Sequence, residues 1–394
     1  MNLIPEAQSL FPYTQSFRRD FHRHPEIGYQ EKRTSGIITQ ELVKLGLSVT
    51  TGVGQTGVVG LLAGEKLGAV ILLRFDMDAL PIQEETAADY ASQNLQVMHA
   101  CGHDGHMAVG LSVAKLLAQH KNEINGTVKF IFQPAEEGVG LSGAEAMIAD
   151  GVLDDPAPNY ALAMHVWNDK PLKWFGITPG PMLAGAEAFK IRIVGKGGHA
   201  ALPHLSVDPV IAAGQVINAL QGIVARNVSP LQTAVVSVTM VHGGEAFNVI
   251  PTGVELQGTI RTFDPDIRQL VLHRFRQIIE GISAASGCTC EIELRQLTPA
   301  LVNDPILAKT VADIASRSFP DSTVDDRFQI MVSEDMAYIL EKVPGCLIFV
   351  GSANAEKGLN YPHHHPKFDF DERALVLSTV LLAETTLELL KNHK

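Results

Sequence analysis

Residues 69–78 read AVILLRFDMD, and residues 99–106 read HACGHDGH. The apolar run that opens the first stretch predicts a buried strand, because strands covered on both faces are continuously apolar. Two carboxylates, Asp76 and Asp78, follow this strand directly. A cysteine and several histidines, which are metal-binding residue types, follow within a loop's length. The sequence therefore predicts a metal site at the end of a buried strand.

Three further apolar runs each precede metal-binding residue types. They are residues 127–133 before Glu136 and Glu137, residues 160–164 before His165, and residues 346–350 before His363, His364 and His365. In an open α/β sheet, ligand sites lie outside the carboxyl ends of the strands. Four such strands would direct all these donors into one crevice, so the pattern predicts a centre with more than one metal ion.

Composition narrows the class of protein. The chain has 394 residues, of which 46% are hydrophobic and 19% charged, so we expect two globular domains. A net charge of −12 argues against a nucleic-acid partner, which would require clustered Lys and Arg. No apolar run has the length of a signal peptide or a membrane span, so we expect neither export nor a membrane. Four irregularly spaced cysteines fit no disulfide framework and indicate a reducing cytoplasm.

The pattern of predicted elements changes near Ala184. From there to residue 297 the order is strand, helix, strand, strand, helix, strand, which is typical of a ferredoxin-like sandwich. We therefore predict an α/β protein: a doubly wound, mixed-sheet, metal-binding catalytic domain of residues 1–183 and 298–394, with an inserted ferredoxin-like α+β lid domain of residues 184–297. Helices are expected at 104–120 with Asp104 as the N-cap, at 206–226 beginning at Ser206, and at 264–285 beginning at Asp264.

The residue types of the cluster indicate its chemistry. Cys101 and His103 lie on a glycine-containing loop, so their side chains can converge; such donors favour Zn, Mn, Co or Ni over Mg or Ca. The adjacent pair Glu136 and Glu137 can divide its roles, one residue binding metal and the other accepting a proton from water. The alternative for a single histidine is a surface or hydrogen-bonded residue, and for the glutamate pair a solvated acidic turn.

Four motifs in order carry a specific resemblance. They are RFDMDALP at 74–81, HACGHDGH at 99–106, FQPAEEG at 132–138 and HHPKF at 364–368. With them the chain resembles, over nearly its whole length, the amidohydrolase branch of the dinuclear metallopeptidase family. That branch contains hippurate hydrolases, N-acyl-amino-acid aminoacylases and plant auxin-conjugate hydrolases.

The resemblance implies a role for each matching residue. Two divalent ions, Mn or Zn with Co or Ni as alternatives, would be held by Cys101, His103, Glu137, His165 and His364. Glu136 would be the general base, and Asp78 the carboxylate behind the metal-bound histidine. Asp76 stands where other branches of the family use a histidine ligand, and the sequence leaves open whether it touches metal.

The inserted domain carries matching motifs of its own. They are GKGGHA at 195–200, FNVIP at 247–251 and GTIRT at 258–262. His199 or Asn248 could stabilise an oxyanion, and Arg261 could bind a carboxylate. The alternatives are a hairpin residue for His199 and an outward strand residue for Arg261. In relatives this domain often dimerises, so we expect a homodimer or higher homo-oligomer.

Together these features predict an enzyme that acts on a small molecule. The expected reaction is metal-dependent hydrolysis of the amide bond of N-acyl-amino acids, with acetyl, benzoyl or similar acyl groups. A dipeptidase or an N-carbamoyl-amino-acid hydrolase of the same fold is the alternative. A non-catalytic metal-binding protein is an alternative from a different functional class. The presence of Glu136, a candidate general base, argues against that alternative.

Overall fold

A computed structural model describes residues 2–138 and 141–392. The chain divides into two compact units. The first unit comprises Met1–Gly180, Val302–Phe328 and Asp335–Lys394, and the second comprises Pro181–Leu301 and Gln329–Glu334. The predicted insertion thus lies inside the second unit, which also takes in the short segment before Asp335. None of the helices in the described part of the chain is long and apolar enough to cross a membrane.

The first unit is built on a mixed sheet, eight-stranded within the described residues, in the order β1-β2-β4-β3-β5-β16-β6-β15. The strands are β1 (Ser48–Val53), β2 (Gly57–Ala63), β3 (Lys66–Asp76), β4 (Asn125–Gln133), β5 (Tyr160–Pro171), β6 (Trp174–Gly176), β15 (Thr323–Asp325) and β16 (Gly345–Ala353). Its central strands β4, β3, β5 and β16 are parallel, and Asp76 pairs with Gln133 in the register. The predicted α/β class is confirmed, and the donor-bearing strand ends lie at one edge of the sheet.

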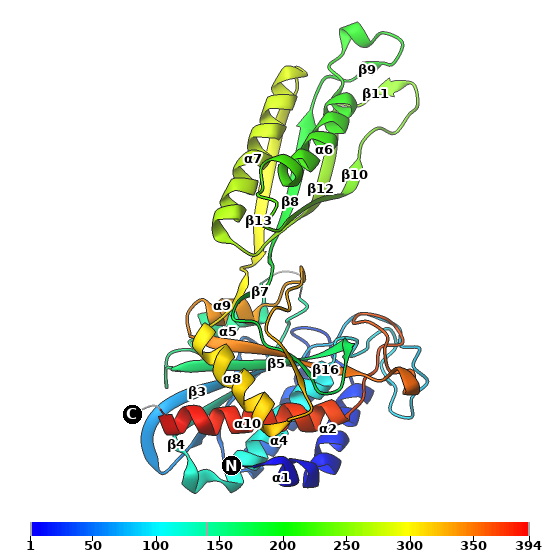
Figure 1. Ribbon diagram of the computed structural model, residues 1–394. Helices are drawn as coiled ribbons and strands as arrows, with labels where there is room; N and C mark the ends of the chain where they lie inside the picture. Colours follow the sequence, from blue (N-terminus) through cyan, green and yellow to red (C-terminus); the bar gives the residue numbers. More distant parts are fainter. Residues whose placement is uncertain (1, 139–140, 393–394) are drawn as a thin grey trace. The chain divides into compact units, whose positions relative to one another are not determined.

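Helices cover both faces of this sheet. Helices α4 and α10 pack against β3, and the shorter α5 and α9 lie on the opposite face (Figure 1). The helices are α1 (Ile4–Ser9), α2 (Phe11–Arg23), α3 (Lys32–Lys44), α4 (His103–Gln119), α5 (Gly143–Ala149), α8 (Pro305–Ser318), α9 (Met336–Leu340) and α10 (Arg373–Asn392), with 3-10 turns at Lys121–Glu123 and Ala355–Lys357. Helix α4 is buried on almost every side, as its small and apolar residues predict.

The prediction that Asp104 caps α4 is wrong. The helix begins one residue earlier, at His103, after Gly102 in the left-handed region with φ +90°. Asp104 is fully buried in the first turn, and its carboxylate accepts hydrogen bonds from Arg18 and His22 instead. Tertiary partners therefore use a side chain that the local pattern assigned to a cap.

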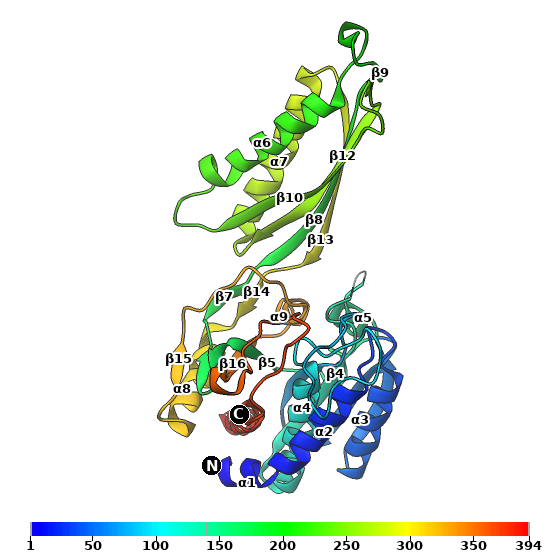
Figure 2. The same ribbon diagram turned by 90° about the vertical axis from the view of Figure 1, so that its right-hand side faces the viewer.

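The second unit has its own antiparallel sheet in the order β10-β12-β8-β13, with helices α6 and α7 packed on it (Figure 2). Its elements are β8 (Gly185–Val194), β9 (Gly198–His199), η2 (Pro203–Leu205), α6 (Pro209–Arg226), β10 (Ala234–His242), β11 (Val249–Ile250), β12 (Gly253–Thr262), α7 (Pro265–Ala285) and β13 (Thr289–Thr298). The βαββαβ order and this strand order make the unit ferredoxin-like.

Capping residues and prolines start both helices of the second unit. Asp264 caps α7 as predicted. Helix α6 begins at Pro209, three residues later than expected, because Asp208 rather than Ser206 supplies the cap by accepting from Val210 N. Two short strands, β7 (Gly180–Leu183) and β14 (Leu301–Asn303), lie where the chain passes between the units.

Candidate metal centre

The predicted donors come together at the carboxyl edge of the first unit's sheet. Ligand atoms lie within 4.8 Å of one another in three sets that share members: Cys101, His103 and His165; Cys101, Glu137 and His364; and His103, Glu136 and Glu137. The structure thus gathers all five predicted ligands and the predicted base into one cluster. His165 lies inside β5 rather than after it, because β5 continues to pair with β16 as far as Pro171.

Asp78 orients His103. The ring Nδ1 of His103 lies 2.9 Å from the backbone oxygen of Asp78, so this nitrogen must carry the proton and donate it. The other nitrogen, Nε2, is buried and has no hydrogen-bond partner within the described residues. Asp78 Oδ2 also accepts from the backbone N–H of Glu137 at 2.9 Å. One aspartate therefore fixes two donors and leaves the lone pair of His103 Nε2 directed into the cluster.

A backbone carbonyl orients His165 in the same way. Its Nδ1 donates to the oxygen of Val166 at 2.7 Å, and its Nε2 lies 3.5 Å from the sulfur of Cys101. Burial lowers the pKa of His165 well below its usual value, so the ring is neutral and can bind a cation. Burial, together with Glu137 and Glu136, raises the pKa of the Cys101 thiol. A bound divalent ion would reverse that preference, because it deprotonates a coordinating thiol.

Two residues at the centre adopt left-handed backbone conformations that side chains rarely take. Ala135, just before the glutamate pair, has φ +49°, and His364 has φ +65°. Ala135 is held by its N–H, which donates to Glu31 Oε1 at 3.0 Å. His364 donates its N–H to Ala100 O at 2.8 Å, and its Nε2 lies 2.8 Å from Glu137 Oε1. The fold thus maintains strained backbone where two proposed ligands converge.

Asp76 is held by neighbours on both carboxylate oxygens. Oδ2 accepts from Arg74 Nη1 at 2.6 Å, and Oδ1 accepts from His106 Nδ1 at 2.6 Å. His106 Nε2 in turn accepts from Val166 N at 3.1 Å, so neither nitrogen of His106 is free to bind metal. The sequence pattern predicted no role for Arg74 or His106. The available signal was their position, in the same motifs as Asp76 and His103.

The centre is negatively charged around His103. Burial alone would lower the pKa of His103, but Asp76 and Asp78 raise it to about 10. Such a field attracts a cation, and the buried, unpartnered His103 Nε2 and the neutral His165 are donors that a proton or a metal ion must satisfy. Thiolate, imidazole and carboxylate donors in overlapping sets fit two divalent ions.

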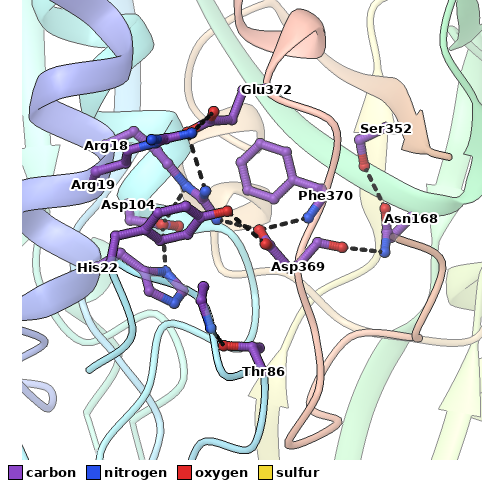
Figure 3. Close-up of polar contacts among 12 residues, drawn as sticks. Arg18, Arg19, His22, Thr86, Asp104, Asn168, Ser352, Asp369, Phe370 and Glu372 are labelled. Atoms are coloured by element: carbon purple, nitrogen blue, oxygen red, sulfur yellow. Dashed lines mark hydrogen bonds and ion pairs between the residues drawn. The ribbon is translucent and has the colours of Figure 1, made fainter. Parts of the chain in front are cut away.

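A buried network of ion pairs joins segments that carry the proposed ligands (Figure 3). Arg18 is fully buried and donates to Asp104 at 2.9 Å, to Asp369 at 2.6 Å and to Glu372 at 3.2 Å. His22 Nδ1 lies 2.7 Å from the same Asp104 oxygen. Because Asp104 follows a proposed ligand in sequence, and Asp369 lies a few residues after His364, this network joins the two segments that supply them.

The remaining predicted residues lie in the second unit. His199 on β9 pairs with Val249 on β11, and its Nδ1 accepts from Ala201 N at 3.1 Å, which leaves Nε2–H as a donor. The backbone oxygen of Asn248 accepts from Ala200 N at 3.0 Å, so His199 and Asn248 belong to one small two-stranded element. Arg261 on β12 is half-buried, and its Nη1 donates to Thr259 Oγ1 and to the backbone oxygen of Ile260. Burial lowers its pKa, and no acidic side chain among the described residues offsets that effect.

Known proteins share both sequence and fold with this chain. A model of the peptidase family M20/M25/M40 matches residues 72–388. The chain is 40% identical over 365 residues to thermostable carboxypeptidase 1 of Saccharolobus solfataricus, covering 92% of each. It is 40% identical over 381 residues to N-acetylcysteine deacetylase of Bacillus subtilis, covering 96% of this chain and 97% of that protein. The crystal structure of a dinuclear metal-binding M20 peptidase from Bacillus subtilis superposes with a TM-score of 0.86 at 35% identity, covering 98% and 99%.

Fold, donor cluster and relatives define a metal-dependent amidohydrolase with a dinuclear centre. The chain belongs to the peptidase family M20/M25/M40. The resemblance predicted from the four motifs is therefore confirmed.

Proposed function

We propose that this amidohydrolase cleaves the amide bond of N-acyl-amino acids and releases a carboxylic acid and a free amino acid. The observation that carries the proposal is the placement of Glu136 beside Glu137 and His103, with their ligand atoms within 4.8 Å. A proton acceptor next to a metal-binding carboxylate suits the attack of water on an amide carbonyl. The 40% identity to N-acetylcysteine deacetylase supports an N-acyl-amino acid as the substrate.

Each proposed site residue of the first unit has a defined role in this proposal. Cys101, His103, Glu137, His165 and His364 would hold two divalent ions, Mn or Zn with Co or Ni as alternatives. Bound divalent ions polarise a carbonyl oxygen and make water more acidic. Glu136 takes the proton from the attacking water and later gives it to the leaving nitrogen as the C–N bond breaks, which returns Glu136 to its ionised form. Asp78 holds His103 and the Glu137 backbone in place.

We also propose that the second unit binds the substrate. Arg261, whose pKa is lowered by burial with no acidic side chain among the described residues to offset it, suits the carboxylate of the amino acid. The Nε2–H of His199 and the side-chain amide of Asn248 suit a developing oxyanion. In this proposal the unit is a lid that closes over the metal centre. Solution scattering with and without a product analogue tests the closure, and identical domain spacing in both states would refute it.

The proposed assembly is a homodimer or higher homo-oligomer. Sedimentation velocity on the metal-loaded protein measures it directly. A monomer at all protein concentrations would contradict this part of the proposal.

A second candidate is hydrolysis of short peptides. The 40% identity to a thermostable carboxypeptidase favours it, and the same centre would serve because a peptide bond is also an amide. The two candidates differ in the acyl group, which pocket shape selects and no motif reports.

A substrate panel separates the candidates. Release of free amino acid is measured with N-acetyl, N-benzoyl and N-indoleacetyl amino acids, with dipeptides and with N-carbamoyl amino acids, after loading with Mn, Zn, Co or Ni. We expect kcat/KM to be at least about 10-fold higher for the best N-acyl-amino acid than for the best dipeptide. The reverse order would establish the peptidase, and turnover that persists in the chelated protein would refute metal dependence.

A further inference from the structure

The carboxylate of Asp335 is buried on the first unit and gathers several donors. It is 1% exposed and directly precedes helix α9. Its Oδ1 accepts from Arg74 Nη2 at 2.7 Å, and its Oδ2 accepts from Ala144 N at 3.0 Å. Both oxygens lie 2.8 Å from Gln133 Nε2. So dense a set of donors around one buried carboxylate is stable only with the charge in place.

Two partners of Asp335, Gln133 and Ala144, lie on either side of the two glutamates along the chain. Gln133 is the last residue of β4, immediately before residues 134–138, and Ala144 lies in the first turn of α5. The ends of this connection also meet directly. Gly143 N donates to Ala135 O at 3.1 Å, and a side chain at Gly143 would collide with Pro134 O at 1.6 Å. Asp335 thus ties together the strand end and the helix start that present Glu136 and Glu137.

The same carboxylate also reaches the other side of the metal centre through Arg74. Arg74 is 1% exposed and donates to Gln133 Oε1 at 2.9 Å and to Asp76 at 2.6 Å. Asp76 is bonded to His106, whose ring accepts from Val166 N next to His165. A continuous buried chain of hydrogen bonds therefore runs from Asp335 to both the glutamate side and the histidine side of the cluster.

We propose that Asp335 is a positioning residue for the reaction: it sets the placement of Glu136 and Glu137 relative to His103 and His165. The proposal rests on the proposed function, because it assigns Glu136 the role of base and Glu137 that of ligand. Asp335 is not among the proposed ligands, but one of its oxygens lies within 4.8 Å of a Glu136 carboxylate oxygen, so its charge also acts on that base. Asp335 acts through Gln133, Ala144 and Arg74, so its removal should loosen the glutamates without removing any donor from the centre.

Asp335→Asn tests the positioning role, because it removes the charge of the side chain and keeps its shape. The amide NH₂ must face one of the N–H donors that the carboxylate accepted, so at least one contact becomes donor against donor. Gln133→Met is the second variant, because it deletes both Asp335–Gln133 contacts and the Arg74–Gln133 hydrogen bond and keeps the Asp335 charge. Glu384→Gln is the matched control. Glu384 is a buried carboxylate on α10, 5% exposed, that accepts from Leu3 N at 2.9 Å and from Ser318 Oγ at 2.5 Å.

Metal affinity is measured on the folded, metal-free protein, and kinetics are measured on the metal-loaded protein. Calorimetric titration of the metal-free protein with Mn²⁺ should give binding at least about 10-fold weaker for Asp335→Asn and Gln133→Met than for wild type. Steady-state kinetics at saturating Mn²⁺ should give a kcat about 10- to 100-fold lower, with KM changed much less. Glu384→Gln should match wild type in both, even if its melting temperature falls.

The outcomes separate this proposal from the proposed function. If wild type hydrolyses none of the amides in the panel, the proposed function fails, and the Mn²⁺ affinities still test the positioning role. If both site variants lose only thermal stability, and bind Mn²⁺ and turn over within about 2-fold of Glu384→Gln, Asp335 is merely structural and the proposal is overturned.

Discussion

Replacing Arg18 by Met should destabilise the first unit strongly, although Arg18 is not a proposed metal ligand. Arg18 is fully buried and serves three carboxylates, those of Asp104, Asp369 and Glu372. Removing one partner of a buried ion pair costs about 3–5 kcal/mol, because the remaining charge stays buried without compensation. Met fills much of the vacated volume, and Asp104 keeps His22, so we expect a loss in that range rather than above it.

Arg19→Met provides a control on the same helix. Arg19 donates to Glu372 at 3.0 and 2.8 Å, but its side chain is 31% exposed, and such pairs contribute about 0–1 kcal/mol. Urea unfolding is followed by tryptophan fluorescence on metal-free protein. Both tryptophans, Trp167 and Trp174, lie buried in the first unit and report on it alone. If the two variants differ by less than about 1 kcal/mol in free energy of unfolding, the network does not support the unit as argued here.

Three further predictions concern the centre and its surroundings. Glu136→Gln should keep its metal and lose kcat by about 10² to 10⁴, whereas Glu137→Gln should lose metal and activity together; metal analysis beside kinetics would show a reversed assignment. Chelation should raise the alkylation rate of Cys101 and leave that of Cys290, in the second unit, unchanged; an unchanged rate at Cys101 would remove it from the ligand set. Burial alone would lower the pKa of His22, but Asp104 and Glu84 raise it to about 9. Its stabilisation is therefore complete below pH 6.5 and is lost as pH rises through about 9. The difference in free energy of unfolding between wild type and His22→Asn should shrink by up to about 3 kcal/mol across that window, and a constant difference would contradict the assignment.

The amino-acid sequence by itself determined the fold class and the membership of the cluster. Apolar runs such as Ala69–Phe75 predict strands covered on both faces, and the parallel strands that form here end at one edge of the sheet. The pattern therefore predicted that the residues after these runs, Cys101, Glu137 and their neighbours, would lie close together, and their ligand atoms do. Local chemistry also marked some helix starts: Asp264 caps α7 as predicted, and Ser142 and Asp304 likewise accept from N–H groups of the helices they precede.

Only the tertiary structure decided how the donors are oriented. The tautomer of His103 follows from the backbone oxygen of Asp78, which lies 25 positions away in the sequence. Arg18 meets Asp369 across 351 positions, and Asp335 meets Gln133 across 202, so neither contact leaves a periodic signal. Asp104 shows the same limit, since its short-range signature was that of a helix cap and its partners lie on α2. Local patterns report what a segment can form, whereas buried charges are satisfied by whichever side chains packing brings within hydrogen-bond distance.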